Sequence, residues 1–455
     1  MNWIKSLFVS DKKFYKLVVT MAIPVVLQNM ITIGLNIIDT FMLGSFGEIQ
    51  IAGSSLANEL INIFHILCMG MGGGAAVLTG MYWGRQDLPA LRKAITIMLR
   101  LCLSIAAVFT LATIFVPELL MKFYTNDEAT IAAAVTYLRY AIPTYLLMGI
   151  SLTLTLVMRS TRQVKLPLYT SIVVFFCNIF LNWVLIFGKF GMPRMEIAGA
   201  SLATTLCRVI ETGIIGGYFL FVDKKVGYRI RDFLRPCGDL LKTYMSYAIP
   251  VIISDGLLAL GNTMVAMIMG RMGPNFVAAN AIIAMTVRLS TVFNQGVSQA
   301  SSVLTGNTLG EGKIEKAYKQ GVTFFMLSII IGVCAAGVIA IVNPFIMHMY
   351  GDNLNAETHA IALQLMLAVM VMVIFQATQG VLTKGVLRGG GDTRFLMIAD
   401  VAFLWLASVP LGYAAAFWWG MSPFWIYIFL KIDWIIKTIW CAFRLKSRKW
   451  IRVVK

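Results

Sequence analysis

Val77-Leu78-Thr79-Gly80 returns 226 positions later as Val303-Leu304-Thr305-Gly306. The same offset, without a gap, relates Ala22-Ile23-Pro24 to Ala248-Ile249-Pro250 and four single positions: Asn36 to Asn262, Gly44 to Gly270, Gly47 to Gly273, and Gly84 to Gly310. At an offset of 229, Arg159 matches Arg388, so the repeat extends beyond the first two helices of each half. The chain is therefore predicted to consist of two equivalent halves.

The composition indicates a membrane protein, because 59% of the residues are hydrophobic and only 13% are charged. Twelve stretches are long enough to cross a bilayer, at 17–44, 51–80, 95–117, 130–158, 166–188, 196–222, 243–270, 276–306, 321–346, 359–387, 395–419 and 422–442. We predict an all-α polytopic membrane protein with twelve transmembrane helices in two pseudo-symmetric six-helix bundles. Such repeats are typical of transporters that rock one half against the other.

The basic stretch between the halves predicts three parts of the chain. Residues 1–222 form an N-terminal lobe, residues 223–242 a cytoplasmic linker, and residues 243–455 a C-terminal lobe with a basic cytoplasmic tail. No removable signal peptide is recognisable at the start, so the first span is expected to remain.

Lysine and arginine are unevenly distributed over the predicted loops. If the N-terminus is cytoplasmic, the opposite loops contain only Lys122, Lys189, Arg194 and Arg271. This imbalance predicts cytoplasmic termini in a plasma membrane and accounts for the net charge of +17. Nucleic-acid binding is disfavoured, because the basic residues are spread over short loops and do not form a clustered stripe.

The sequence lacks the residue patterns expected for disulfides, metal sites, enzyme active sites and ATP binding. The seven cysteines are scattered, and the three histidines lack a cysteine or carboxylate at ligand spacing, so neither a disulfide framework nor a metal site is expected. Clustered catalytic groups are also missing, which argues against an enzyme. No Gly-x-x-x-x-Gly-Lys-Ser/Thr motif is present, so an ion gradient and not ATP is the expected energy source.

Ionisable groups within spans are costly and therefore become functional candidates. Asp39 lies five residues before Gly44, about 7 to 8 Å from the outer end of the first span. In the fifth span Asn182 lies at a similar height, and Asn178 is one turn away on the same face. These three are predicted to form a carboxylate–amide cluster that takes up a proton or a sodium ion. The alternative is that Asp39 is hydrated and only supports helix packing.

Asn36, on the same helix as Asp39, suits either ligand contact or a hydrogen bond between helices. The role of Glu59 and His65 in the second span stays open, with packing or interface positions favoured.

The second half differs from the first at the charged positions. Asp39 corresponds to Val265, so ion coupling is expected to be asymmetric. Asp255 and Arg288 replace two asparagines of the first half, which predicts a buried and mainly structural ion pair between them. Other charged residues are expected to pair locally or to lie near membrane edges: Arg208 with Glu211, Asp400 at the inner edge, and Arg100, Arg139, Lys431 and Asp433 near interfaces.

Four segments resemble the multidrug and toxic compound extrusion (MATE) family: Asn36-Ile37-Ile38-Asp39-Thr40, Asn178 to Asn182 with the following Leu185-Ile186-Phe187-Gly188, Gly199 to Thr204, and Leu387-Arg388-Gly389-Gly390-Gly391-Asp392-Thr393. The resemblance implies a fold of two six-helix lobes with a central cavity. It also implies that Asp39, with Asn178 and Asn182, couples transport to a cation. Many members have an acid where this chain has Asn182, which leaves the identity of the ion open. Members coupled through the other lobe have an acid in the tenth span, and this chain has only glutamines there.

The resemblance implies export of organic cations in exchange for H⁺ or Na⁺. We expect no cofactor, and a monomer in the lipid bilayer. A flippase for lipid-linked precursors in the same superfamily is the alternative. Such a flippase would be expected to have several basic groups in its cavity, whereas Arg139, Arg208 and Arg288 are assigned to positions outside it.

Overall fold

A computed structural model describes residues 8–9, 11–351 and 355–452, and these residues contain helices but no β-strand. The first half contains α2 (Lys12–Gly44), α3 (Glu48–Arg85), α4 (Leu88–Phe115), α5 (Pro117–Lys122), α6 (Glu128–Ser160), α7 (Lys165–Phe187), α8 (Glu196–Gly217), the π-helix η1 (Tyr218–Val222) and α9 (Ile230–Phe233). The second half contains α10 (Gly238–Arg271), α11 (Pro274–Gly310), α12 (Ile314–Gly351), α13 (Ala356–Gly380), η2 (Val381–Leu387), α14 (Thr393–Phe403), η3 (Leu404–Ser408), α15 (Val409–Phe417), α16 (Pro423–Leu430) and α17 (Ile432–Lys446).

The helices confirm the predicted membrane fold. In the described part of the chain, ten helical segments are long and apolar enough to cross a membrane, and the bent helix α11 makes an eleventh. The last predicted span, 422–442, is formed by α16 and α17, which separate at Lys431. Each of these two helices is too short to cross a bilayer alone, because a spanning helix needs about 20 residues.

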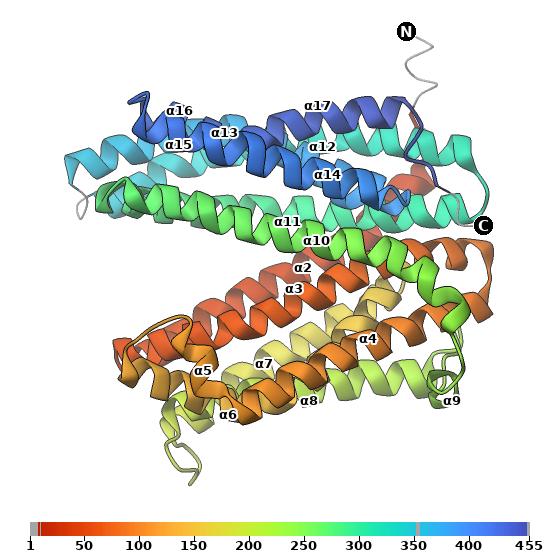
Figure 1. Cartoon of the computed structure of the whole chain (residues 1–455), viewed down its shortest axis with the longest axis horizontal. Helices are drawn as coiled ribbons and strands as arrows, with labels where there is room; N and C mark the ends of the chain where they lie inside the picture. Colours follow the sequence, from red (N-terminus) through yellow and green to blue (C-terminus); the bar gives the residue numbers. More distant parts are fainter. Residues whose placement is uncertain (1–7, 10, 352–354, 453–455) are drawn as a thin grey trace. The chain divides into compact units, whose positions relative to one another are not determined.

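Contacts divide the chain into two compact units, whose helices can be followed in Figure 1. Unit 1 comprises Met1–Val26, Gly80–Gln86 and Ile249–Lys455, and unit 2 comprises Leu27–Thr79 and Asp87–Ala248. Within unit 2, α8 packs against α6 and α7, and α6 also packs against α4. Within unit 1, α13 packs against α11 and α12 around a core of aliphatic, methionine and aromatic side chains. The unit boundaries thus divide α2, α3 and α10. The lobe boundaries drawn from the sequence remain a prediction.

Two glycines related by the repeat meet inside unit 1. A Cβ atom on Gly84 would overlap the backbone oxygen of Asn307, and one on Gly310 would overlap the backbone oxygen of Met81. Glycine has no side chain, so α3 and α11 approach each other here more closely than any other residue would permit. The repeat in the sequence therefore has a direct structural counterpart at this crossing.

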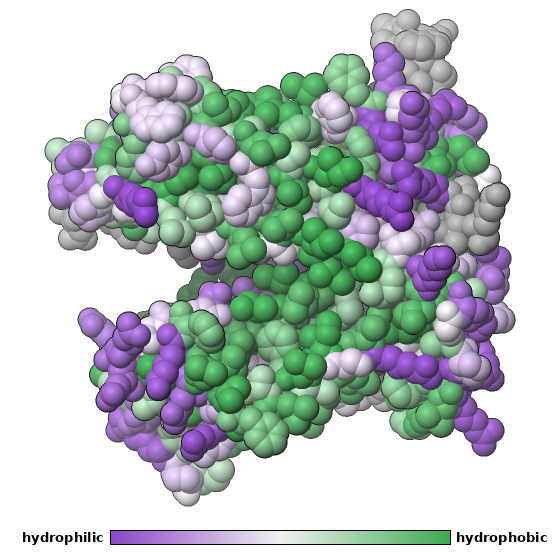
Figure 2. Space-filling view, viewed as in Figure 1, coloured by the Kyte–Doolittle hydropathy of each residue, from purple (hydrophilic) through white to green (hydrophobic). Residues whose placement is uncertain are grey.

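The surface has the polarity of a membrane protein. On the face shown in Figure 2, hydrophobic residues cover the middle of the helices and hydrophilic residues gather near their ends. Large exposed hydrophobic side chains include Phe41, Phe176, Ile341 and Leu406. Lipid chains can cover such residues without the cost that water would impose.

Candidate functional site

Asp39 of α2 and two asparagines of α7 form one hydrogen-bonded cluster within unit 2. The Nδ2 atom of Asn182 donates to Asp39 Oδ1 at 2.5 Å and to Asn178 Oδ1 at 2.9 Å. Asn182 is fully buried, Asn178 is 4% exposed and Asp39 is half-buried. The structure therefore brings together the three residues that helix heights and the helical period predict to be neighbours. Their role in ion coupling stays a prediction.

One hydrogen-bond acceptor of the cluster has no donor among the described residues. Among the described residues, no hydrogen-bond partner reaches Asn182 Oδ1, although the atom is buried. A buried polar atom without a partner is costly, so this oxygen is available to an incoming group. Carboxylate and amide oxygens suit hard cations, and a carboxylate can instead take up a proton. The same site thus has the chemistry to bind either a proton or a sodium ion.

A tyrosine beside the cluster gave no signal in the sequence. Tyr137 of α6 is buried, its hydroxyl donates to Asn58 Oδ1 at 3.4 Å, and it lies within electrostatic range of Asp39. From the sequence, a tyrosine in an apolar helix is indistinguishable from an ordinary core residue.

Asn36, the fourth predicted site residue, has an exposed side chain. Its backbone oxygen accepts from the Thr40 hydroxyl at 2.8 Å.

Asp255 pairs with Arg388 and not with the predicted partner Arg288. Two nitrogens of the Arg388 guanidinium lie 3.1 and 3.5 Å from the two carboxylate oxygens of Asp255, and both side chains are largely buried. Arg288, on α11, has an exposed side chain. The prediction failed because counting residues along two helices gives the height of each side chain but not the direction in which it points.

The first half has a neutral version of this pair. Arg159, which the repeat relates to Arg388, donates to the amide oxygen of Gln28. Gln28 corresponds at an offset of 226 to Ser254, the residue directly before Asp255. In each half, therefore, the arginine at the end of the fourth span contacts the first helix of that half.

A buried charge cluster in unit 1 was missed by the sequence reasoning. The Lys437 ammonium lies 3.2 Å from Asp400 Oδ1 and 3.0 Å from Asp433 Oδ2, and the three side chains are each 3% exposed. The hydroxyls of Ser254 and Ser408 donate to the two carboxylates, each at 2.7 Å. Asp400 and Asp433 are thus core residues, not the membrane-edge groups that were expected. The spacing of Asp433 and Lys437, four apart on one helix, was the available signal.

The remaining charged candidates lie elsewhere. Arg208 pairs with Glu211 at 2.6 Å, as their spacing predicted, and half-buried His65 lies within electrostatic range of both. Glu59 is exposed. Among the residues that the structure describes, no group of three histidine, cysteine or acidic side chains could bind a metal ion.

Comparisons with known proteins agree on one family. The family model described as MatE matches residues 24–184 and 250–414. The "Probable multidrug resistance protein NorM" of Thermotoga maritima is 24% identical over 441 residues, covering 96% of this chain and 93% of the relative. The "Multidrug resistance protein MdtK" of Pectobacterium atrosepticum is 26% identical, covering 87% and 86%.

Solved structures show the same fold. The crystal structure of a MATE protein in the bent conformation has a TM-score of 0.83 at 19% identity and covers 96% of each chain. An outward-facing structure of a multidrug resistance MATE family transporter has a TM-score of 0.83 at 19% identity and covers 95% of this chain and 96% of the other.

Proposed function

The chain belongs to the MATE family of transporters, and from this membership we propose that it exports organic cations in exchange for protons or sodium ions. Support for multidrug efflux comes from the names of its relatives, which are multidrug resistance proteins matched over most of their length. The proposed location is the plasma membrane with both termini in the cytoplasm, which rests on the distribution of lysine and arginine.

The cluster of Asp39, Asn178 and Asn182 is the observation that carries this proposal. A carboxylate in a membrane-spanning helix is expensive unless it has a function or a partner. Here its partner is a neutral amide, so the negative charge is stabilised by hydrogen bonding but not neutralised. A cation that enters the cluster neutralises this charge, and its departure restores it.

This change of one charge provides the coupling. While Asp39 is ionised, the unit attracts either an organic cation or the small ion; after the small ion binds, that attraction is lost. Binding of one cation then weakens binding of the other. This antagonism supplies the coupling free energy that an antiporter requires. Unit 1 lacks an equivalent acid, because Val265 occupies the corresponding position and is 2% exposed. Coupling at this site is therefore asymmetric.

The proton and the sodium ion make different demands on the cluster. A proton needs only Asp39, whereas a sodium ion needs several oxygens, for which Asn178 Oδ1 and the free Asn182 Oδ1 are the nearest amide candidates. The two cases can be separated experimentally, because replacing Asn182 by leucine removes a ligand oxygen but keeps the carboxylate.

The test is efflux of a fluorescent organic cation from proteoliposomes, with a proton gradient or a sodium gradient imposed separately. The wild type should extrude the dye under at least one gradient. Asp39→Asn keeps the size of the side chain but removes its charge, and it should abolish gradient-driven efflux while the protein still folds.

Glu48→Gln is the matched control, because it removes one exposed carboxylate from the start of α3 and should leave efflux unchanged. Efflux by Asp39→Asn at the wild-type rate would exclude Asp39 as the coupling site. A wild type that extrudes no organic cation under either gradient would overturn the proposed function itself.

A further inference from the structure

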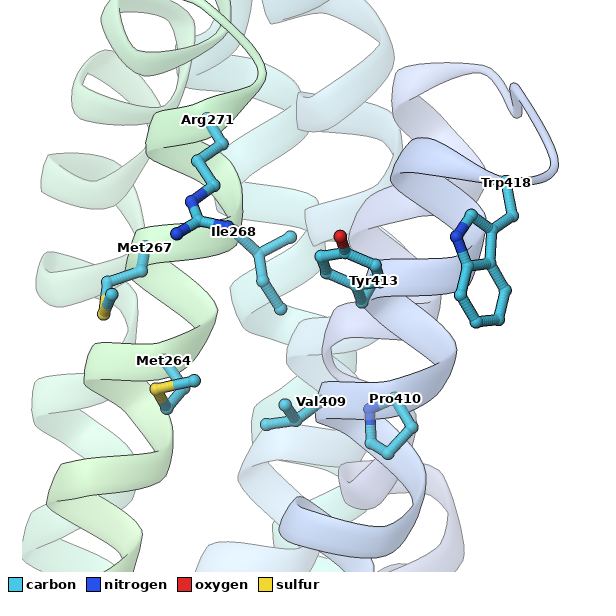
Figure 3. A pocket seen from close by; sticks show the side chains of 8 residues that line it. All are labelled: Met264, Met267, Ile268, Arg271, Val409, Pro410, Tyr413 and Trp418. Atoms are coloured by element: carbon cyan, nitrogen blue, oxygen red, sulfur yellow. The ribbon is translucent and has the colours of Figure 1, made fainter.

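A groove of about 420 Å³ opens within unit 1 between α10 and α15 (Figure 3). It is lined from α10 by Met264, Met267, Ile268 and Arg271, and from the other side by Val409, Pro410, Tyr413 and Trp418. Arg271 is the only charged residue among these eight, and the others are apolar or aromatic. A groove of this volume is large enough for part of an amphiphilic molecule.

The polarity of the groove changes along its length. Arg271 is the last residue of α10, and Trp418 directly follows the last residue of α15, so both mark the same boundary of the membrane-spanning region. Met264 lies seven residues before Arg271, and Pro410 lies eight before Trp418, which places both about 10 to 12 Å deeper. The groove thus runs from the level where arginine and tryptophan are favoured into the hydrocarbon region.

The positive charge of Arg271 at one end of the groove favours an anionic ligand. The Arg271 side chain is exposed, and no acidic residue is among the eight lining residues. In Figure 3 the Arg271 side chain runs back along α10, and the Tyr413 ring faces α10 from α15. An organic cation would be repelled here by the guanidinium, whereas a phosphate can accept several hydrogen bonds from it.

We propose that this groove binds an anionic phospholipid from the leaflet opposite the chain termini. Arg271 binds the phosphate, Tyr413 and Trp418 contact the region of the ester groups, and one acyl chain lies against Met264, Met267 and Val409. The flexible thioether side chains adapt to an acyl chain of variable shape. The absence of a carboxylate from the lining favours a headgroup such as glycerol over one with an ammonium group, which would face Arg271 without a partner.

The site is tested by native mass spectrometry of the detergent-purified protein titrated with phosphatidylglycerol. The wild type should retain bound phosphatidylglycerol, and Arg271→Gln should weaken this binding roughly tenfold, the effect of losing one charge-assisted contact. Arg271→Lys should keep part of the binding, and phosphatidylcholine should bind the wild type more weakly than phosphatidylglycerol does. Arg194→Gln is the matched control, because Arg194 is a predicted outer-loop arginine of the other unit that pairs with Glu196 at 3.3 Å.

A second variant tests the apolar part separately. Met267 is 49% exposed, so Met267→Trp should fill the groove without disturbing the core, and it should weaken lipid binding although Arg271 is intact. Equal retention of phosphatidylglycerol by the wild type, Arg271→Gln and Met267→Trp would overturn the proposal. Displacement of the lipid by inorganic phosphate at equal concentration would also overturn it, because the apolar groove would then contribute nothing.

Discussion

Arg388 and Asp255 form an ion pair between the end of η2 and helix α10, with two guanidinium nitrogens at 3.1 and 3.5 Å from the carboxylate oxygens. In the first half, Arg159 makes the corresponding contact with neutral Gln28. Both halves thus use an arginine for the same helix contact, but among the described residues its partner is a carboxylate in the second half and a neutral amide in the first. The helix arrangement does not itself require an acid at this position.

Breaking the Asp255–Arg388 pair should be costly. Asp255→Asn leaves Arg388 buried without a counter-charge and should lower the free energy of unfolding by about 3 kcal/mol. Adding Arg388→Gln removes the unpaired charge and should recover much of the loss. The measurement is the midpoint of thermal unfolding in detergent. Arg288→Gln serves as the control: if it rescues Asp255→Asn and Arg388→Gln does not, the pairing seen here is incorrect.

The stability of unit 1 should depend strongly on Lys437. Lys437→Met leaves two buried carboxylates facing each other and should destabilise the protein by about 3 to 5 kcal/mol. The triple variant with Asp400→Asn and Asp433→Asn should regain most of this stability, because it removes all three charges. Lys431→Met is the control, since Lys431 is only half-buried and donates to neutral Asn262 at 3.2 Å. Equal melting temperatures of Lys437→Met and Lys431→Met would contradict a stabilising role of the charge cluster.

Replacing glycine by alanine should destabilise the protein where α3 and α11 cross and stabilise it at a glycine with open space around it. Gly84→Ala and Gly310→Ala each insert a Cβ atom into a neighbouring backbone and should cost about 1 to 3 kcal/mol. Gly337→Ala, in α12 with open space around it, should instead stabilise its helix by about 0.5 to 1 kcal/mol. Unfolding of purified variants in detergent provides the comparison. A Gly84→Ala protein as stable as Gly337→Ala would show that the two helices are farther apart.

If Asp39 is the coupling site, Asn182→Asp should retain transport and shift its pH or sodium dependence. The substitution replaces the amide that donates to Asp39 with a second carboxylate, and two carboxylates at this distance need a proton or a cation between them. Cation binding should therefore tighten, and the pH or sodium dependence of dye efflux from proteoliposomes should shift. An unchanged dependence on both ions would place the coupling ion away from Asn182.

The sequence by itself determined the features that repeat along the chain or depend on height within a membrane. The offset of 226, the hydropathy and the loop charges predicted an all-α protein of two six-helix halves. The cluster of Asp39, Asn178 and Asn182 was also predictable, because two helices that cross in the same direction place residues at equal distances from their ends at equal heights. Height and helix face together were sufficient there.

Only the tertiary structure decided which side chains meet when several helices offer a partner at similar height. Arg388 and Arg288 were both available as partners for Asp255, and the packing of the tenth span against α10 selected Arg388. Asp400 and Lys437 are far apart in the sequence and lie on different helices, and their contact depends on how α14 and α17 pack in three dimensions. Hydropathy and helical period describe each helix separately, whereas such pairings depend on the rotation of neighbouring helices about their axes.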